Sequence, residues 1–250
     1  IMASLKEVKG RIASVNNTRK ITSAMKMVAS AKLHKAQAAI ESMLPYERRL
    51  HHILTDFMSN CTEVTSPFIV KREVKKVAVV VFASNTSLCG GFNANVIRHL
   101  VDLLAEYKPL GLENILVFPV GKKVADAVRK LGFRIEGDFQ HMADKPSYQE
   151  AADLAADLMK RFLHGDVDKV ELLYNHFKST ASQILTRETY LPIDLNNEKK
   201  EEERTIDYIL EPSAEELMQE MLPKVLRMKM FTVLLDSNAA EHAARTMAMQ

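Results

Sequence analysis

The chain has 250 residues, of which 47% are hydrophobic and 26% charged, a composition typical of a globular protein. No run of about 18 apolar residues is present, which excludes an ordinary membrane-spanning helix, and no secretory signal peptide is visible. The two cysteines, Cys61 and Cys89, are too few for a four-ligand zinc site and favour a reducing compartment such as the cytoplasm.

The net charge of +2 conceals an uneven distribution. Residues 1–50 carry ten Lys or Arg and three Asp or Glu, a balance of +7, so residues 51–250 carry −5. A basic segment of this kind is either a solvated face or a surface for nucleic acid, anionic lipid or an acidic protein. Aromatic residues are scarce before Tyr46, which argues against base stacking on single-stranded nucleic acid. The apolar residues between the cations also argue for a helix partner.

One long helix is predicted over the first 60 or so residues. A heptad register that begins at Leu5 and Val8 has 17 seam positions up to residue 61, and 13 of them are apolar, as in a coiled coil. Such a helix would be about 80 Å long and would project beyond its own domain. Pro45 is expected to bend the helix without ending it, because the apolar pattern resumes at Leu50.

The seam of this helix is polar at three consecutive positions, Arg19, Thr22 and Lys26. One interpretation is that the seam opens there and faces a polar surface. The other is that the apolar stripe shifts sideways to Ile21, Met25 and Val28.

The middle of the chain is predicted to be an α/β domain with a mixed sheet. Strands are expected at 76–82, 114–120, 133–139, 170–177, 183–190 and 205–210, and helices at 93–107, 122–131 and 148–164. Alternating strands and helices indicate a sheet that is at least partly parallel, and the consecutive strands after residue 168 indicate an antiparallel addition.

A second long amphipathic helix is predicted from Ser213 to the end of the sequence. Ser213 and Glu216 fit a capping box, and Pro223 is expected to strain or kink the helix. The expected domains are therefore an N-terminal helix at 1–62, a Rossmann-like α/β domain at 63–211 and a C-terminal helix at 212–250.

The sequence contains no recognisable catalytic, cofactor or metal site. The loop from Ser87 to Asn93 follows a strand, where α/β proteins often bind phosphate, but it lacks GxGxxG. The Gly121-Lys122 pair lacks the preceding glycine of a P-loop. A tight turn is the favoured interpretation, and a nucleophilic Cys89 would need a histidine partner. The histidines of the long helix have no i, i+4 partner suited to a metal, so they are expected to be ordinary surface residues.

Three segments resemble one protein family. Residues 11–29 (RIASVNNTRKITSAMKMVA), 88–93 (LCGGFN) and 241–249 (EHAARTMAM) are similar, in the same order, to the motifs of the gamma subunit of the F-type ATP synthase. The three matches span nearly the whole chain.

The resemblance implies an antiparallel coiled coil of the two terminal helices, with a Rossmann-like domain at its base. It implies a non-catalytic rotor shaft without a cofactor, which couples proton or sodium flow to ATP synthesis or hydrolysis. The implied partners are the alpha and beta subunits of the catalytic ring, the epsilon subunit and the membrane c-ring, and no nucleic acid. The implied location is peripheral, on the cytoplasmic side of a bacterial inner membrane.

The resemblance also implies roles for individual residues. Lys20, Met25 and Lys26 match the segment that meets the acidic lever loops of the beta subunits. Arg245 and Gln250 match a second set of contacts with the stator. The segment that approaches the membrane ring and the epsilon subunit is matched by Tyr208 and Glu211.

The chain departs from the family pattern in several places. Asn85-Thr86-Ser87 replaces the Asp-Arg-Gly or similar sequence that often precedes the LCGG turn, so the role of that segment is open. The family's C-terminal helix continues for several turns after the position of Gln250. The regulatory insertion and transit peptide of the chloroplast form are missing, which favours a bacterial protein. Two alternatives remain from the residues alone: a structural coiled-coil adaptor and a nucleotide-binding α/β enzyme.

Overall fold

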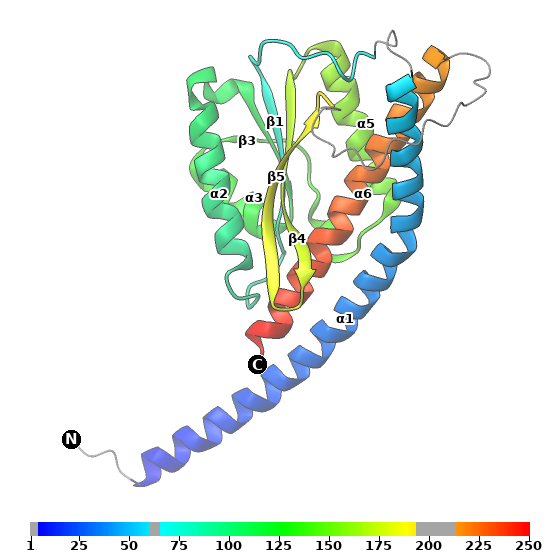
Figure 1. Ribbon diagram of the computed structural model, residues 1–250. Helices are drawn as coiled ribbons and strands as arrows, with labels where there is room; N and C mark the ends of the chain where they lie inside the picture. Colours follow the sequence, from blue (N-terminus) through cyan, green and yellow to red (C-terminus); the bar gives the residue numbers. More distant parts are fainter. Residues whose placement is uncertain (1–4, 61–65, 194–213) are drawn as a thin grey trace.

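The computed structural model describes residues 5–60, 66–193 and 214–250, which form two long helices and an α/β domain (Figure 1). The helices are α1 (Leu5–Asn60), α2 (Phe92–Tyr107), α3 (Lys122–Leu131), α4 (Gln140–Asp144), α5 (Tyr148–His164) and α6 (Ala214–Ala248). The strands are β1 (Val77–Phe82), β2 (Ile115–Val120), β3 (Arg134–Ile135), β4 (Lys169–Ser179) and β5 (Ser182–Leu191). Short 3-10 turns lie at Lys108–Leu110 and Leu112–Asn114.

The five strands form one sheet in the order β3-β2-β1-β4-β5. The pairings β1–β2, β1–β4 and β2–β3 are parallel, and β4–β5 is antiparallel, so the predicted mixed sheet is confirmed. Every residue of β1 and β2 is buried, because helices cover both faces of the sheet.

The third strand is shorter than predicted. Only Arg134 and Ile135 pair with β2, because the chain turns at Gly137, which has a φ of +75°. The residues after this turn form the short helix α4, which the sequence pattern did not predict.

Each face of the sheet has its own helical layer. Helices α2 and α3 cover one face, where Val77, Val79 and Val81 are buried. Helices α5 and α6 cover the other face, where Ala78, Val80 and Phe82 are buried (Figure 1). The alternation along β1 therefore assigns odd positions to one layer and even positions to the other. This arrangement places α6 in the domain core as well as against α1.

Helices α1 and α6 run antiparallel, and α1 passes along the outer side of α6 (Figure 1). Leu33 and Ala36 of α1 pack on Ala239 and Ala243 of α6, and all four are buried. Residues 5–21 of α1 extend beyond the rest of the molecule, so their apolar side chains are exposed, Leu5 at 75%. Both predicted long helices are confirmed.

The seam of α1 is buried from Ala29 onward, whereas Arg19 in the polar segment is exposed. Burial follows Ala29, Leu33 and Ala36, and Lys26 is half-buried. Neither interpretation of the polar positions is settled, because Met25 of the shifted stripe is half-buried like Lys26, whereas Ile21 and Val28 are 62% and 59% exposed. Helix α1 also continues through Pro45 without interruption, as expected.

Several predictions fall outside the described residues. These are the strand at 205–210, the cap at Ser213, the contact residues Tyr208 and Glu211, and Cys61. Among the described residues, no helix is long and apolar enough to cross a membrane.

Candidate functional site: the basic surface of α1 and the C-terminal part of α6

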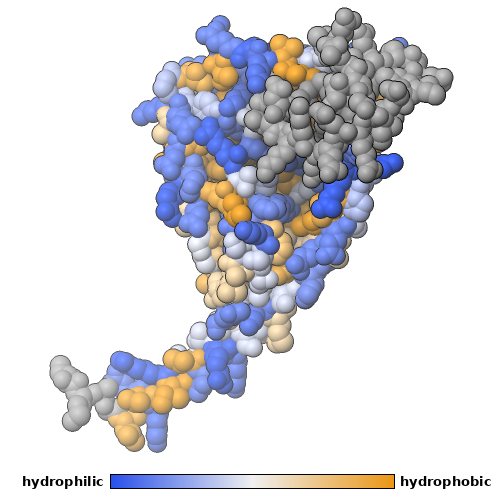
Figure 2. Space-filling view, in the orientation of Figure 1, coloured by the Kyte–Doolittle hydropathy of each residue, from blue (hydrophilic) through white to orange (hydrophobic). Residues whose placement is uncertain are grey.

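The protruding part of α1 carries the basic surface that the sequence predicted. The basic surface lies on residues 6–35 of α1, a segment that we call the arm and in which Glu7 is the single acid. All eight of its cations are exposed except the half-buried Lys26: Lys6, Lys9, Arg11, Arg19, Lys20, Lys26, Lys32 and Lys35. Arg11 lies 2.8 Å from Glu7, with both side chains in solvent. Within the described residues, neither Lys20 nor Lys26 has an ion pair. Figure 2 shows this arm with hydrophilic residues interspersed with apolar ones.

A small hollow lies where the end of α6 meets α1. Its volume is about 260 Å³, and its walls are formed by Ala24, Met25, Val28, Ala29 and Lys32 of α1 with His242 and Arg245 of α6. Met25 is half-buried in this hollow. The structure thus places the predicted contact residues Met25 and Lys26 beside the α1–α6 seam, whereas Lys20 is exposed on the arm.

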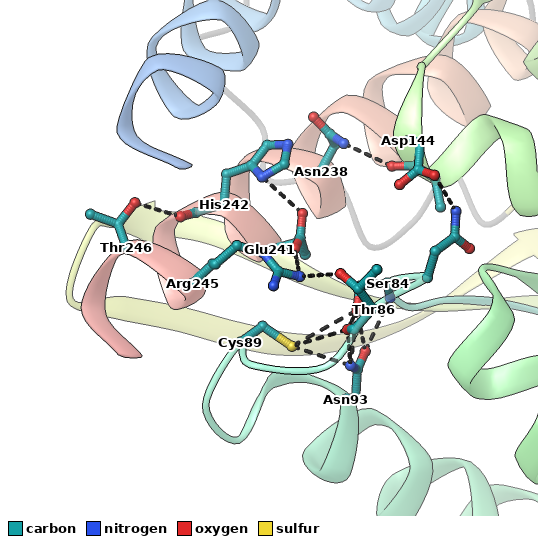
Figure 3. Close-up of polar contacts among 12 residues, drawn as sticks. Ser84, Thr86, Cys89, Asn93, Asp144, Asn238, Glu241, His242, Arg245 and Thr246 are labelled. Atoms are coloured by element: carbon teal, nitrogen blue, oxygen red, sulfur yellow. Dashed lines mark hydrogen bonds and ion pairs between the residues drawn. The ribbon is translucent and has the colours of Figure 1, made fainter. Parts of the chain in front are cut away.

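Arg245, a predicted stator contact, is bound within the chain. Its guanidinium donates hydrogen bonds to the carbonyl oxygen of Ser87 at 2.6 Å and to the hydroxyl of Thr86 at 2.9 Å. It also donates to the carboxylate of Glu241, 2.7 Å from Nε (Figure 3). Its side chain is only 13% exposed. Gln250 is exposed at the end of the chain.

Glu241 is buried beside two basic groups. Burial, the largest influence, would raise the pKa of its carboxyl, but the contacts with His242 and Arg245 lower that pKa below the ordinary value of a glutamate. Nδ1 of His242 lies 2.9 Å from the Glu241 carboxylate, although the contact lacks the alignment of a hydrogen bond. Glu241 therefore remains ionised and holds the Arg245 guanidinium in place.

The loop after β1 is held by the side chain of Asn93. Asn93 accepts a hydrogen bond from the amide of Ser84 at 3.0 Å and donates to the hydroxyl of Ser84 at 2.9 Å (Figure 3). Leu88 and Gly90 have φ angles of +67° and +59°, which makes the turn tight. Cys89 is buried under α6, so its environment is that of a packed side chain and not of an exposed nucleophile.

The end of β1, where related folds bind phosphate, is covered by α6. Ala240 and Ala244 of α6 pack on Cys89 and Phe92. A side chain at Gly90 would lie 3.8 Å from Ala248. The space left between the strand ends and α6, beside Phe82 and Glu241, is about 10 Å³, too little for a nucleotide. Among the described residues, no cluster of His, Cys, Asp or Glu is suited to a metal ion.

The segment Asn85-Thr86-Ser87, whose role the sequence left open, has a structural one. The Asn85 amide donates to Asp144 at 2.7 Å and accepts a hydrogen bond from the backbone amide of Lys122 at 2.8 Å. Thr86 and Ser87 accept from Arg245. Sequence reasoning missed these contacts because their partners lie on distant segments.

The fold and surface together define a class of protein: a shaft of two antiparallel helices carried by a Rossmann-like domain whose ligand crevice is filled. A family described as ATP synthase matches residues 4–250. The ATP synthase gamma chain of Phocaeicola vulgatus is 80% identical, covering 100% of this chain and 87% of that relative. The gamma chain of Bacteroides thetaiotaomicron is 60% identical, with the same coverage. The chain belongs to the gamma chain family of the F-type ATP synthase, the non-catalytic subunit that forms the central stalk of that complex.

The fold also resembles a solved structure of the central stalk and c-ring of the Tetrahymena thermophila mitochondrial ATP synthase. That match has a TM-score of 0.61 at 22% identity and covers 92% of this chain and 97% of the other. At this identity the likeness concerns the fold alone.

Proposed function

We propose that this rotor subunit couples proton or sodium flow to ATP synthesis or hydrolysis through electrostatic contacts between α1 and acidic loops of the catalytic beta subunits. The observation that carries the proposal is the cationic surface on a helix that extends beyond its own domain, where within the described residues neither Lys20 nor Lys26 has an ion pair. Positive charge on the rotor attracts carboxylates on the stator. Each exposed ion pair contributes only about 0–1 kcal/mol, so the rotor can leave one contact and form the next.

In this proposal Lys20, Met25 and Lys26 meet one set of beta-subunit loops. Gln250 and Arg245 form a second set of contacts with the stator. Arg245 makes its stator contact while its guanidinium stays hydrogen-bonded to Thr86 and Ser87 of the α/β domain. Tyr208 and Glu211, outside the described residues, face the epsilon subunit and the membrane c-ring. The alpha subunits complete the ring around the shaft.

The proposal also divides the chain into a shaft and a head. Residues 1–62 and 212–250 form the shaft, and residues 63–211 form the head near the membrane. The complex is bacterial, and this subunit is peripheral to the cytoplasmic side of the inner membrane.

Charge reversal on the arm tests the proposal. Lys20→Glu and Lys26→Glu are each expected to lower coupled ATP synthesis by up to about fivefold, because one rotor–stator attraction becomes a repulsion. The measurement is ATP synthesis by reconstituted vesicles at low ionic strength, where screening is weakest.

Lys130→Glu is the matched control, because Lys130 is also an exposed helical lysine but lies on α3 of the head. Unchanged synthesis in both arm variants, in fully assembled complexes, would contradict the electrostatic contact and favour a static coiled-coil adaptor. Saturable nucleotide binding by the isolated subunit would instead support an α/β enzyme.

A further inference from the structure

One face of α6 is bound to the head by polar side chains. Asn238, Glu241 and Arg245 follow one another at i, i+3 and i+7, so they lie on the same side of the helix. Asn238 donates to the carbonyl oxygen of Ala143 in α4 at 2.9 Å. Arg245, oriented by Glu241, donates to the loop after β1. We call these three residues the α6 anchor (Figure 3).

The two attachment points of the α6 anchor belong to one rigid unit. Asn85 joins them, because its side-chain amide donates to Asp144 of α4 at 2.7 Å and to the carbonyl oxygen of Gln140 at 2.8 Å. Asn85 directly precedes Thr86, the partner of Arg245. The loop after β1 and the helix α4 therefore cannot move apart without breaking these bonds.

Nearer its N-terminal end, α6 is held in the domain core by large apolar side chains such as Phe231 and Leu234, and Asp236 accepts a hydrogen bond from the amide of Phe177 at 2.8 Å. Between residues 238 and 248, the apolar contacts of α6 with α1 and with the loop after β1 are made instead by four alanines: Ala239, Ala240, Ala243 and Ala244. An alanine surface allows close approach but offers no long side chains that interlock with the neighbouring element. Hydrogen bonds depend on direction, and the forked guanidinium of Arg245 fixes both position and angle.

We propose that the α6 anchor fixes the rotation of the C-terminal part of α6, residues 238–248, relative to the sheet domain, so that twist of the shaft is transmitted to the head. Asn238, Glu241 and Arg245 are positioning residues in this proposal, which rests on the proposed function of the chain as a torque-transmitting rotor. The small exposed fraction of Arg245 agrees with a role inside the subunit.

Two variants in the assembled complex test the proposal. Arg245→Lys keeps the positive charge but loses the forked contact, and Thr86→Val removes one of the two acceptors of Arg245 on the head, leaving the Ser87 carbonyl and α6 unaltered. Both are expected to lower the torsional stiffness of the rotor in single-molecule measurements. Both should also speed hydrogen exchange of the α6 amides between residues 238 and 248 by about tenfold, since a hydrogen bond to a charged group is lost.

Arg129→Lys is the matched control, because Arg129 makes an exposed 3.0 Å ion pair with Asp126 on α3. Unchanged stiffness and exchange in both Arg245→Lys and Thr86→Val would overturn the α6 anchor while leaving the rotor function intact. A loss of coupling in Lys20→Glu with normal exchange in α6 would support the rotor function independently. Preserved coupling in the arm variants together with a softened rotor in Thr86→Val would reject the electrostatic contact and retain the α6 anchor.

Discussion

Replacing Ala243 with glutamate is expected to separate the two long helices and to prevent assembly of the rotor. Ala243 is fully buried between α6 and α1, where it packs on Leu33 and Ala36. A carboxylate at this position would be buried beside apolar side chains without a partner. An uncompensated buried charge destabilises a protein by about 3–5 kcal/mol. Chemical unfolding of the subunit, followed by its incorporation into the complex, measures the effect.

Ala38→Glu provides the control for this substitution. Ala38 is an exposed alanine of α1, so the same change there adds charge without burying it. If Ala243→Glu unfolds within about 1 kcal/mol of the parent and assembles normally, Ala243 does not lie in a packed helix–helix contact.

Gly121→Ala is expected to destabilise the head domain by more than about 4 kcal/mol. Gly121 has a φ of +113°, which side chains rarely adopt, and an added Cβ would lie 2.2 Å from the carbonyl oxygen of Ala83. That oxygen belongs to the backbone just after β1 and cannot rotate away. The turn between β2 and α3 therefore requires glycine for close packing, and not for phosphate binding. Thermal unfolding of the subunit measures the loss.

Gly132→Ala separates backbone strain from steric overlap. Gly132 also has a positive φ, of +78°, but nothing lies within 4 Å of an added Cβ. Its substitution is expected to cost about 1–2 kcal/mol, the strain alone. Equal losses in the two variants would contradict the close contact between Gly121 and Ala83.

The elements that the sequence predicted well are those with strong local patterns. The apolar run of β1 and the amphipathic pattern of α5 define their own boundaries, and the predicted helix at 148–164 coincides with α5. The heptad register of α1 also predicted which residues face α6, because Ala29, Leu33 and Ala36 occupy seam positions.

The features that the sequence did not predict depend on distant partners. Arg245 and Thr86 are 159 residues apart, and no local pattern indicates their contact. Likewise, Asn85 was visible only as a departure from a family pattern, although it joins α4 to the loop after β1. The sequence left two interpretations of the polar seam open because the position of α6, and not the local hydrophobicity, decides which face of α1 is buried.

The most direct test of the rotor account is single-molecule rotation of a complex reconstituted with the full-length subunit and a probe attached to the sheet domain. ATP is predicted to drive continuous rotation of the probe in one direction. A complex that is fully assembled and hydrolyses ATP while the probe stays still would contradict the account.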